Sequence, residues 1–114
     1  MNIVTIGVSS AEDAKQRTTA AFRGRRQGAR IAFASVALLW KVLNAKRWEL
    51  LKAITGRGAM TIRATARLVG RDVKAVHGDI HALLAASVLD RTSEGKVVFP
   101  YDGIRVEFTL TRAA

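Results

Sequence analysis

The sequence of 114 residues contains no cysteine and only one proline. Without thiols the chain forms no disulfide, offers no thiol nucleophile and cannot bind zinc through cysteine. Long hydrophobic runs are also missing, since the longest apolar stretch, residues 36–40, is far too short to cross a bilayer. The first residues do not resemble a signal peptide. We therefore expect a cytoplasmic protein that has no membrane-spanning segment.

Acidic side chains are scarce as well. The chain has 19 lysines and arginines against 9 aspartates and glutamates, a net charge of +10. Hydrophobic residues make up 49% of the sequence, which indicates one globular domain rather than a disordered chain. The positive charge favours a polyanionic partner, nucleic acid first and an anionic membrane or an acidic protein second, because binding neutralises phosphates and releases counterions.

The first third of the chain is predicted to be an extension. Residues 2–8 are rich in β-branched side chains and residues 30–35 alternate, so both segments are typical of strands. Between them, Ser9 and Glu12 have the spacing of a capping box, which predicts a helix. We interpret residues 1–34 as a strand-helix-strand extension for dimerisation or partner binding. A basic arm, or equally a solvated linker, is formed by Arg23, Arg25, Arg26 and Arg30.

The middle of the chain predicts several short helices. Ser35, Asn44, Thr61 and Asp72 each precede an amphipathic or apolar segment, as helix N-caps do. The segment 36–43 is apolar nearly all round, so we expect it to be central to the core. Both tryptophans, Trp40 and Trp48, lie within apolar stripes and are expected in the core.

A tight link of Gly70 and Arg71 joins the last two of these helices, a spacing typical of a helix-turn-helix. The second helix has one predicted buried stripe, formed by Val73, Val76, Ile80, Leu83 and Leu84. Its other face carries hydrogen-bond donors and small residues, namely Arg71, Lys74, Ala75, His77, Gly78 and His81. Glycine inside a helix costs about 1 kcal/mol relative to alanine, so Gly78 calls for an explanation.

Beyond Ser87 the hydrophobic period changes to about two residues, which predicts strands separated by turns at Glu94-Gly95 and at Asp102-Gly103. We expect the Asp-Gly pair to form a hairpin, and Pro100 to mark an edge or a strand end. Three helices followed by a β-hairpin is the order of a winged helix-turn-helix. The predicted fold is therefore α+β: a three-helix core and a C-terminal wing over residues 35–114, after the N-terminal extension.

The stretch TIRATARLVGRDVKAVHGDIHALLAASVLDRTSEGKVVFPYDGIRVEF resembles the winged helix-turn-helix of MarR-type repressors and other small bacterial and archaeal regulators. With KRWELLKAI and IAFASVALLWKVL before it, the chain is also similar to short transcriptional regulators and antitoxin-like proteins. The resemblance covers residues 31–108. It implies that residues 61–69 position a recognition helix at 72–86, and that strands around Lys96 form the wing.

On this resemblance, DNA is expected to bind the six residues of the recognition-helix face, from Arg71 to His81. It is also expected to bind Thr61, which caps the preceding helix, and Arg63 within that helix. In the wing, Arg91 and Lys96 are expected to contact DNA. The family pattern V-H-x-D has a bulky polar residue where this chain has Gly78, so a base contact does not transfer to that position. A glycine there would instead let the helix approach the DNA backbone closely.

The same helix has two other interpretations, a solvated or protein-docking face and a metal site. Its polar face is solvated in many interaction domains, and winged helices also serve as protein-docking modules. A metal site on His77 and His81 has helical i, i+4 spacing, but Gly78 replaces the glutamate of a zincin, Asp79 points to the far side, and no further histidine or cysteine exists.

The sequence thus predicts a sequence-specific double-stranded DNA-binding regulator, a homodimeric repressor, without cofactor, metal or enzymatic activity. No catalytic arrangement of side chains stands out. An antitoxin that binds a toxin protein and regulates its own operon is the alternative. RNA binding is disfavoured, because aromatics form only 6% of the chain and most occupy expected core positions.

Overall fold

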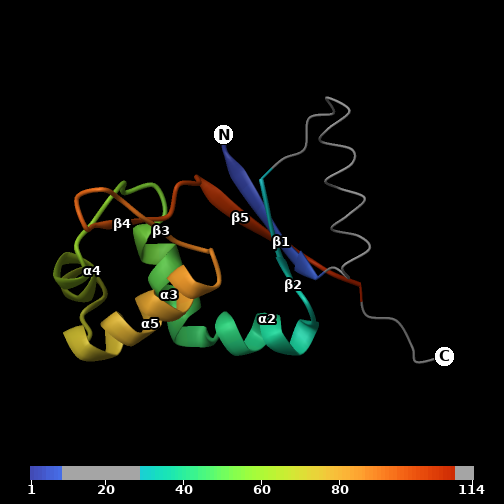
Figure 1. Cartoon of the computed structure of the whole chain (residues 1–114), viewed down its shortest axis with the longest axis horizontal. Coiled ribbons are helices and arrows are strands. Elements are labelled where there is room, and N and C mark those ends of the chain that lie inside the picture. The colour runs from blue at the N-terminus through green and yellow to red at the C-terminus, as the bar shows by residue number, and fades with distance from the viewer. Residues whose placement is uncertain (9–28, 110–114) are drawn as a thin grey trace.

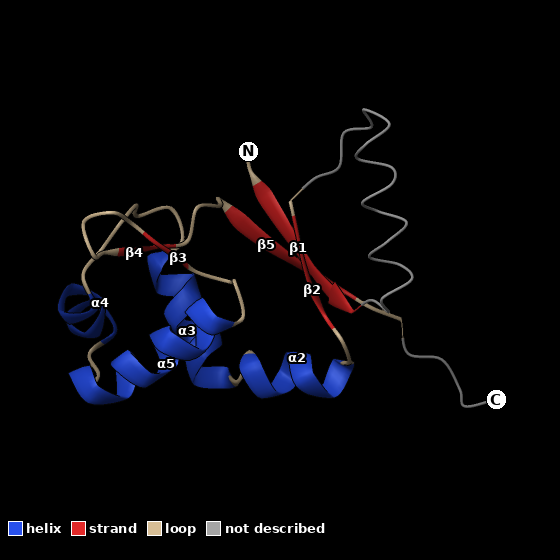
Figure 2. Cartoon of the chain, in the orientation of Figure 1, coloured by secondary structure: helices blue, strands red, loops and turns tan. Residues whose placement is uncertain are grey.

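The structure is a computed structural model that describes residues 1–8 and 29–109. A three-stranded sheet packs against helices on one side, and a two-stranded sheet lies at the far end of those helices (Figure 1 and Figure 2). The elements are β1 (Ile3–Val8), β2 (Arg30–Phe33), α2 (Val36–Val42), α3 (Ala45–Ile54), α4 (Ile62–Val69), α5 (Val73–Ala85), β3 (Asp90–Arg91), β4 (Val97–Val98) and β5 (Gly103–Glu107). The predicted α+β class is confirmed. None of the described helices has the length and apolar character that a membrane span requires.

The first strand lies at the centre of the larger sheet, whose order is β2-β1-β5 with both neighbours parallel to β1. Ile6 pairs with Ile31 on one side and with Val106 on the other. Val4 and Ile6 are fully buried, since they face the helices. The sheet therefore unites the N-terminal strands with the C-terminal strand, across the boundary that the sequence placed at residue 34.

The hairpin predicted at Asp102-Gly103 is wrong. Strand β5 does not join β4 but pairs in parallel with β1, so that Ile104 lies beside Val4. Asp102 instead fixes the start of the chain: its Oδ2 accepts a hydrogen bond from the Asn2 backbone N–H at 2.7 Å, and its own N–H donates to the Asn2 carbonyl at 2.7 Å. The Asp-Gly pair favours a hairpin between β4 and β5, but β4 has only two residues and β1 has six. Strand β5 therefore pairs with β1 instead.

The four helix starts predicted in the middle of the chain are confirmed. The side chains of Ser35, Asn44, Thr61 and Asp72 each accept a hydrogen bond from the backbone N–H three residues later, at 3.0, 3.0, 3.0 and 3.2 Å respectively. Each bond satisfies an amide that has no partner within its helix, so the sequence fixes these boundaries locally.

The expectation that the segment 36–43 is central to the core is wrong for much of α2. Leu39 and the following Leu43 are buried, but Leu38 and Trp40 are 41% and 54% exposed. Trp40 is thus a surface residue that stacks edge-on against Phe108, with ring centroids 5.9 Å apart, while Trp48 is half-buried. The reason is that α2 packs on β1 and β2 through the side that carries Leu39, which leaves Leu38 and Trp40 toward the surface.

Candidate nucleic-acid interface

A tight turn joins α4 to α5. Gly70 ends α4 with φ 67° and ψ 34°, the left-handed conformation that glycine adopts at little cost. The N–H groups of Gly70 and Arg71 donate to the carbonyls of Arg67 and Ala66 at 3.3 and 3.0 Å. Asp72 then caps α5, and the two helices pack against each other. The link predicted from the sequence is therefore formed, with α5 held directly after α4.

The buried side of α5 is narrower than predicted. Val76, Ile80 and Leu83 are fully buried, whereas Val73 is 41% exposed and Leu84 is only half-buried. The cause is position: Val73 lies in the first turn, beyond the reach of the core, and Leu84 lies near the helix end. The three central residues alone fix which side of α5 faces inward.

The opposite side of α5 is exposed to solvent. It carries the hydrogen-bond donors and small residues that the sequence predicted there, namely Lys74, Ala75, His77, Gly78 and His81. The rings of His77 and His81 lie together, with centroids 4.1 Å apart. A Cβ added to Gly78 would meet no atom within 4 Å. Packing within the described chain therefore does not explain this glycine. We call these five residues the outer face of α5.

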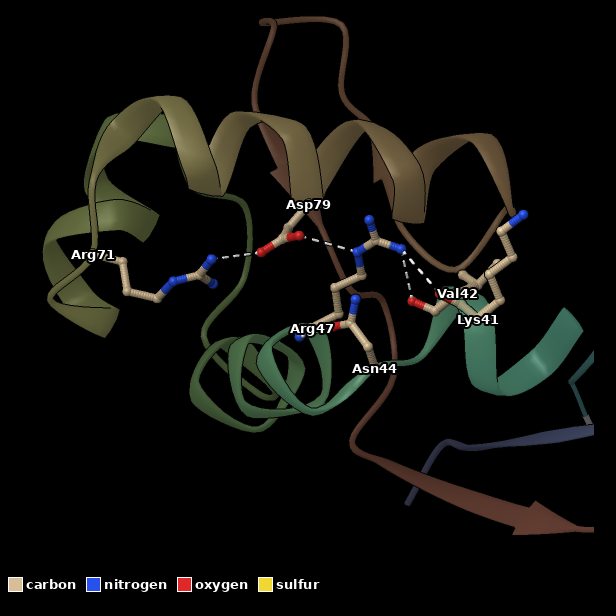
Figure 3. A network of polar contacts seen from close by, with 6 residues as sticks. All are labelled: Lys41, Val42, Asn44, Arg47, Arg71 and Asp79. Atoms are coloured by element: carbon tan, nitrogen blue, oxygen red, sulfur yellow. Dashed lines mark hydrogen bonds and ion pairs between the residues drawn. The ribbon is translucent and has the colours of Figure 1, made fainter. Parts of the chain in front are cut away.

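Arg71, which the sequence analysis included in this face, lies elsewhere. Its Nη2 donates to Asp79 Oδ2 at 2.8 Å, while Arg47 Nε donates to Asp79 Oδ1 at 3.0 Å (Figure 3). Arg47 also donates from Nη1 to the Val42 carbonyl at 3.1 Å. Asp79, with only 14% of its side chain exposed, thus joins α3, α5 and the turn before α5. The half-buried guanidinium of Arg71 is therefore paired with Asp79 and is not free to reach a base.

The role of Asp79 was missed in the sequence, although a signal was present. Asp79 stands three residues after Val76 and four before Leu83, and so lies on the buried side of α5. A carboxylate among buried positions requires a cationic partner, because burying a lone charge is costly. Arg47 and Arg71 supply that charge. Since Asp79 is the only acidic residue within α5, its inward position leaves the outer face without a carboxylate.

The predicted turn at Glu94-Gly95 is confirmed in the short hairpin of β3 and β4, where the Thr92 N–H donates to the Lys96 carbonyl at 2.9 Å. Arg91 is exposed, and Lys96 is half-buried with its Nζ 3.7 Å from Glu94. A third segment joins this sheet: Met60, before α4, exchanges two 2.8 Å backbone hydrogen bonds with Val97. This third segment thus comes from before the helix pair, and not from the residues after Asp102-Gly103, which the sequence predicted to continue the hairpin.

The remaining predicted residues are divided between two places. Thr61 and Arg63 are exposed at the start of α4, and Arg67, which was not predicted, is exposed further along it. Arg30 belongs to β2 in the larger sheet, apart from α4 and the small hairpin (Figure 1). The other three arginines of the predicted basic arm, and the helix predicted after Ser9, lie outside the described residues.

The pair of histidines on α5 has no further metal ligands beside it among the described residues. Within residues 1–8 and 29–109, no group of three histidine, cysteine, aspartate or glutamate side chains is placed to hold an ion. His77 and His81 stand without a third such ligand in the described chain, and the Asp79 carboxylate is turned toward the two arginines.

These features define a small α+β protein with a tightly linked helix pair whose second helix exposes a face of donors and small residues. The HVO_A0114 family model matches residues 42–106, more than half of the chain. The chain belongs to the HVO_A0114 family. The match begins at the end of α2 and covers α3, both linked helices and the small hairpin. No curated protein and no solved structure gave a significant match.

Proposed function

We propose that this chain is a winged helix-turn-helix protein that binds double-stranded DNA in a sequence-specific manner and regulates transcription, as a homodimeric repressor. In this proposal α3, α4 and α5 are the three-helix core, and α5 is the recognition helix. The hairpin of β3 and β4, with Met60 as its third segment, is the wing. The placement of α5 after a left-handed Gly70 turn supports the assignment.

The outer face of α5 is the observation that carries the proposal. It combines Lys74 and two histidines with Ala75 and Gly78, and the single carboxylate of α5 is turned away from it. Donors suit the acceptor-rich edges of purines, and small residues let a helix enter the major groove deeply. The net charge of +10 supplies the attraction to phosphates that non-specific binding requires.

The roles of individual residues follow from their positions. Lys74 and His77, near the N-terminal end of α5, are assigned to base edges, and His81 to a base or a phosphate. Phosphate contacts, which position the protein without reading sequence, are assigned to Thr61, Arg63, Arg91 and Lys96. Arg71 is removed from the contact set, because its guanidinium is paired with Asp79.

The test begins with the selection of DNA by the purified protein from a random pool. On the selected site and on random DNA, Lys74→Ala and His77→Ala are expected to lower the ratio of specific to non-specific affinity by about tenfold each. Lys96→Ala is expected to weaken both affinities together, since a phosphate contact is blind to sequence. Lys52→Ala, an exposed lysine of α3, is the control.

A pool that yields no enriched sequence would remove the DNA-reading function. Enrichment with unchanged ratios in both α5 variants would instead remove the assignment of the outer face while leaving DNA binding in place. A selected site with two inverted halves about one helical turn apart would agree with two-fold symmetry.

A further inference from the structure

Strand β5 is an edge of the larger sheet. Among the described residues it pairs with β1 alone, so its other side presents backbone N–H and C=O groups without a strand partner. Edge strands are templates for another strand, and proteins usually block them by shortness, proline or charge. The five residues of β5 contain no proline, and their two charges, Arg105 and Glu107, are of opposite sign.

The side chains of β5 alternate in a way that suits pairing with a second copy. Ile104 and Val106 are half-buried and lie beside the buried Val4 and Ile6 of β1, on the side of the helices. Arg105 and Glu107 are exposed on the opposite side of the sheet. Two copies of β5 that pair about a two-fold axis perpendicular to the sheet keep these two sides distinct.

Charge favours one register for such a pair, the only one centred on a β5 residue that places opposite charges face to face. Antiparallel pairing centred on Val106 places Arg105 directly opposite the partner's Glu107, and by symmetry places Glu107 opposite the partner's Arg105. Pairing centred on Arg105 or on Glu107 would instead bring like charges together, which is unfavourable. A shift by one residue would turn the apolar side of one copy toward the solvent side of the other.

Apolar hollows lie beside the same strand, on the helix side. One of about 520 Å³ is bordered by Val106, Trp40 and Trp48, and a second of about 320 Å³ is bordered by Ile104, Trp48 and Leu51. In the register centred on Val106, the partner's Ile104, Val106 and Phe108 extend the apolar side of the sheet next to these hollows. Trp40 and Phe108, both exposed in one copy, lie at the end of this seam.

The other edge of the sheet lacks these properties. Strand β2 has four residues, and its only charged residue is Arg30. Antiparallel pairing centred on Ile31 or on Ala32 would place Arg30 opposite an alanine, without a compensating carboxylate. Self-complementary charge therefore distinguishes β5 from β2.

We propose that β5 is the homodimer interface: two copies pair antiparallel about Val106, forming one continuous six-stranded sheet with Arg105 paired to the partner's Glu107. The proposal rests on the homodimer proposed above, and it names the surface that forms it. It does not depend on DNA binding.

Charge reversal tests the register. Arg105→Glu and Glu107→Arg each turn two attractive cross-strand pairs into repulsive ones, and each is expected to raise the dimer dissociation constant about tenfold. The double variant R105E/E107R restores both pairs and is expected to dimerise as the wild type does. The exposed Lys46→Glu is the control for added negative charge. Sedimentation equilibrium at low salt measures all five proteins, with melting curves to verify that each is folded.

Engineered cysteines test the same register independently, because the chain has none of its own. Val106→Cys is expected to form a disulfide-linked dimer under mild oxidation, since cross-strand Cα distances of about 4.5 to 5.5 Å fit a disulfide. Ile104→Cys alone is expected to stay monomeric on denaturing gels, but to cross-link when mixed with Phe108→Cys. Cross-linking of Ile104→Cys to itself, equal to that of Val106→Cys, would overturn the register.

The remaining outcomes separate the two proposals. A monomeric wild type overturns both the interface and the homodimer, whatever the DNA selection shows. A dimeric wild type with single variants of unchanged affinity, or a double variant no better than the singles, overturns the β5 interface alone. Stable pairing with a foreign protein through β5, in place of self-association, would also refute it.

Discussion

A substitution at Gly78 is expected to change the stability of the fold and the affinity for DNA in opposite directions. It lies inside α5 between two exposed histidines, where its backbone is helical and an added Cβ meets no atom within 4 Å. Alanine at such a position lowers the backbone entropy of the unfolded chain without a clash in the folded one. We therefore expect Gly78→Ala to raise the free energy of unfolding by about 0.5 to 1 kcal/mol, and the melting temperature by about 2 to 5 °C.

Urea denaturation and thermal melting followed by circular dichroism measure this gain. Ala75→Gly, at an exposed position on the same face, is the matched control, and is expected to lower stability by up to the same amount. A lower melting temperature for Gly78→Ala, with unchanged secondary structure, would refute the argument. It would mean that the outer face of α5 is covered at this position in the free protein.

The same variant tests whether DNA binding explains the glycine at position 78, where alanine would make the fold more stable. If α5 enters the major groove as proposed, the methyl group of Gly78→Ala lies between helix and DNA, so we expect weaker binding to the selected site despite a more stable fold. Gel-shift titration of both proteins measures the change. Equal or tighter binding would leave the glycine without a role in DNA contact, even if the stability gain is found.

Three further predictions concern stability, each checked by urea denaturation. Asp79→Ala is expected to lower the free energy of unfolding by about 1 to 2 kcal/mol. This is less than for a fully buried ion pair, because the side chains of Arg47 and Arg71 remain 21% and 24% exposed. An unchanged urea midpoint would mean that the network of Figure 3 does not hold α5 on α3. Gly70→Ala is expected to lower the free energy of unfolding by about 1 to 2 kcal/mol, because residue 70 has a left-handed φ of 67°. Gly70→Asn is expected to lower it less, since asparagine tolerates this conformation better. Equal losses would point to another cause. Thr61→Ala should cost about 1 kcal/mol through loss of the α4 cap while Thr61→Ser stays near wild type, and equal stability of the two would exclude a capping role.

Local signals in the sequence were sufficient for the helices. The caps at Asn44 and Asp72, the left-handed Gly70 and the buried trio of α5 act over a few residues, so the chain encodes them wherever it folds. The exposed residues of α5 could be predicted for the same reason, since three buried positions determine which side faces out. The charge that favours a nucleic-acid partner is likewise a property of composition.

Long-range pairing was beyond these signals. The exposure of Trp40 depends on what α2 finds to pack against, and Arg71 looked free because its partner Asp79 lies eight positions along a helix. The ion pair of Arg47 with Asp79 spans 32 positions, and no local pattern specifies such a distance.

The sequence by itself determined the α+β class, the four described helix starts, the turns at Gly70 and at Glu94-Gly95, and the side of α5 that faces outward, because each depends on neighbours within about two helical turns. Only the tertiary structure decided that β5 lies beside β1, that Met60 joins the small hairpin, and that Asp79 holds two arginines. Strand partners and buried ion pairs are chosen among distant segments by competition for the same core. That choice has no signature in any one stretch of the chain.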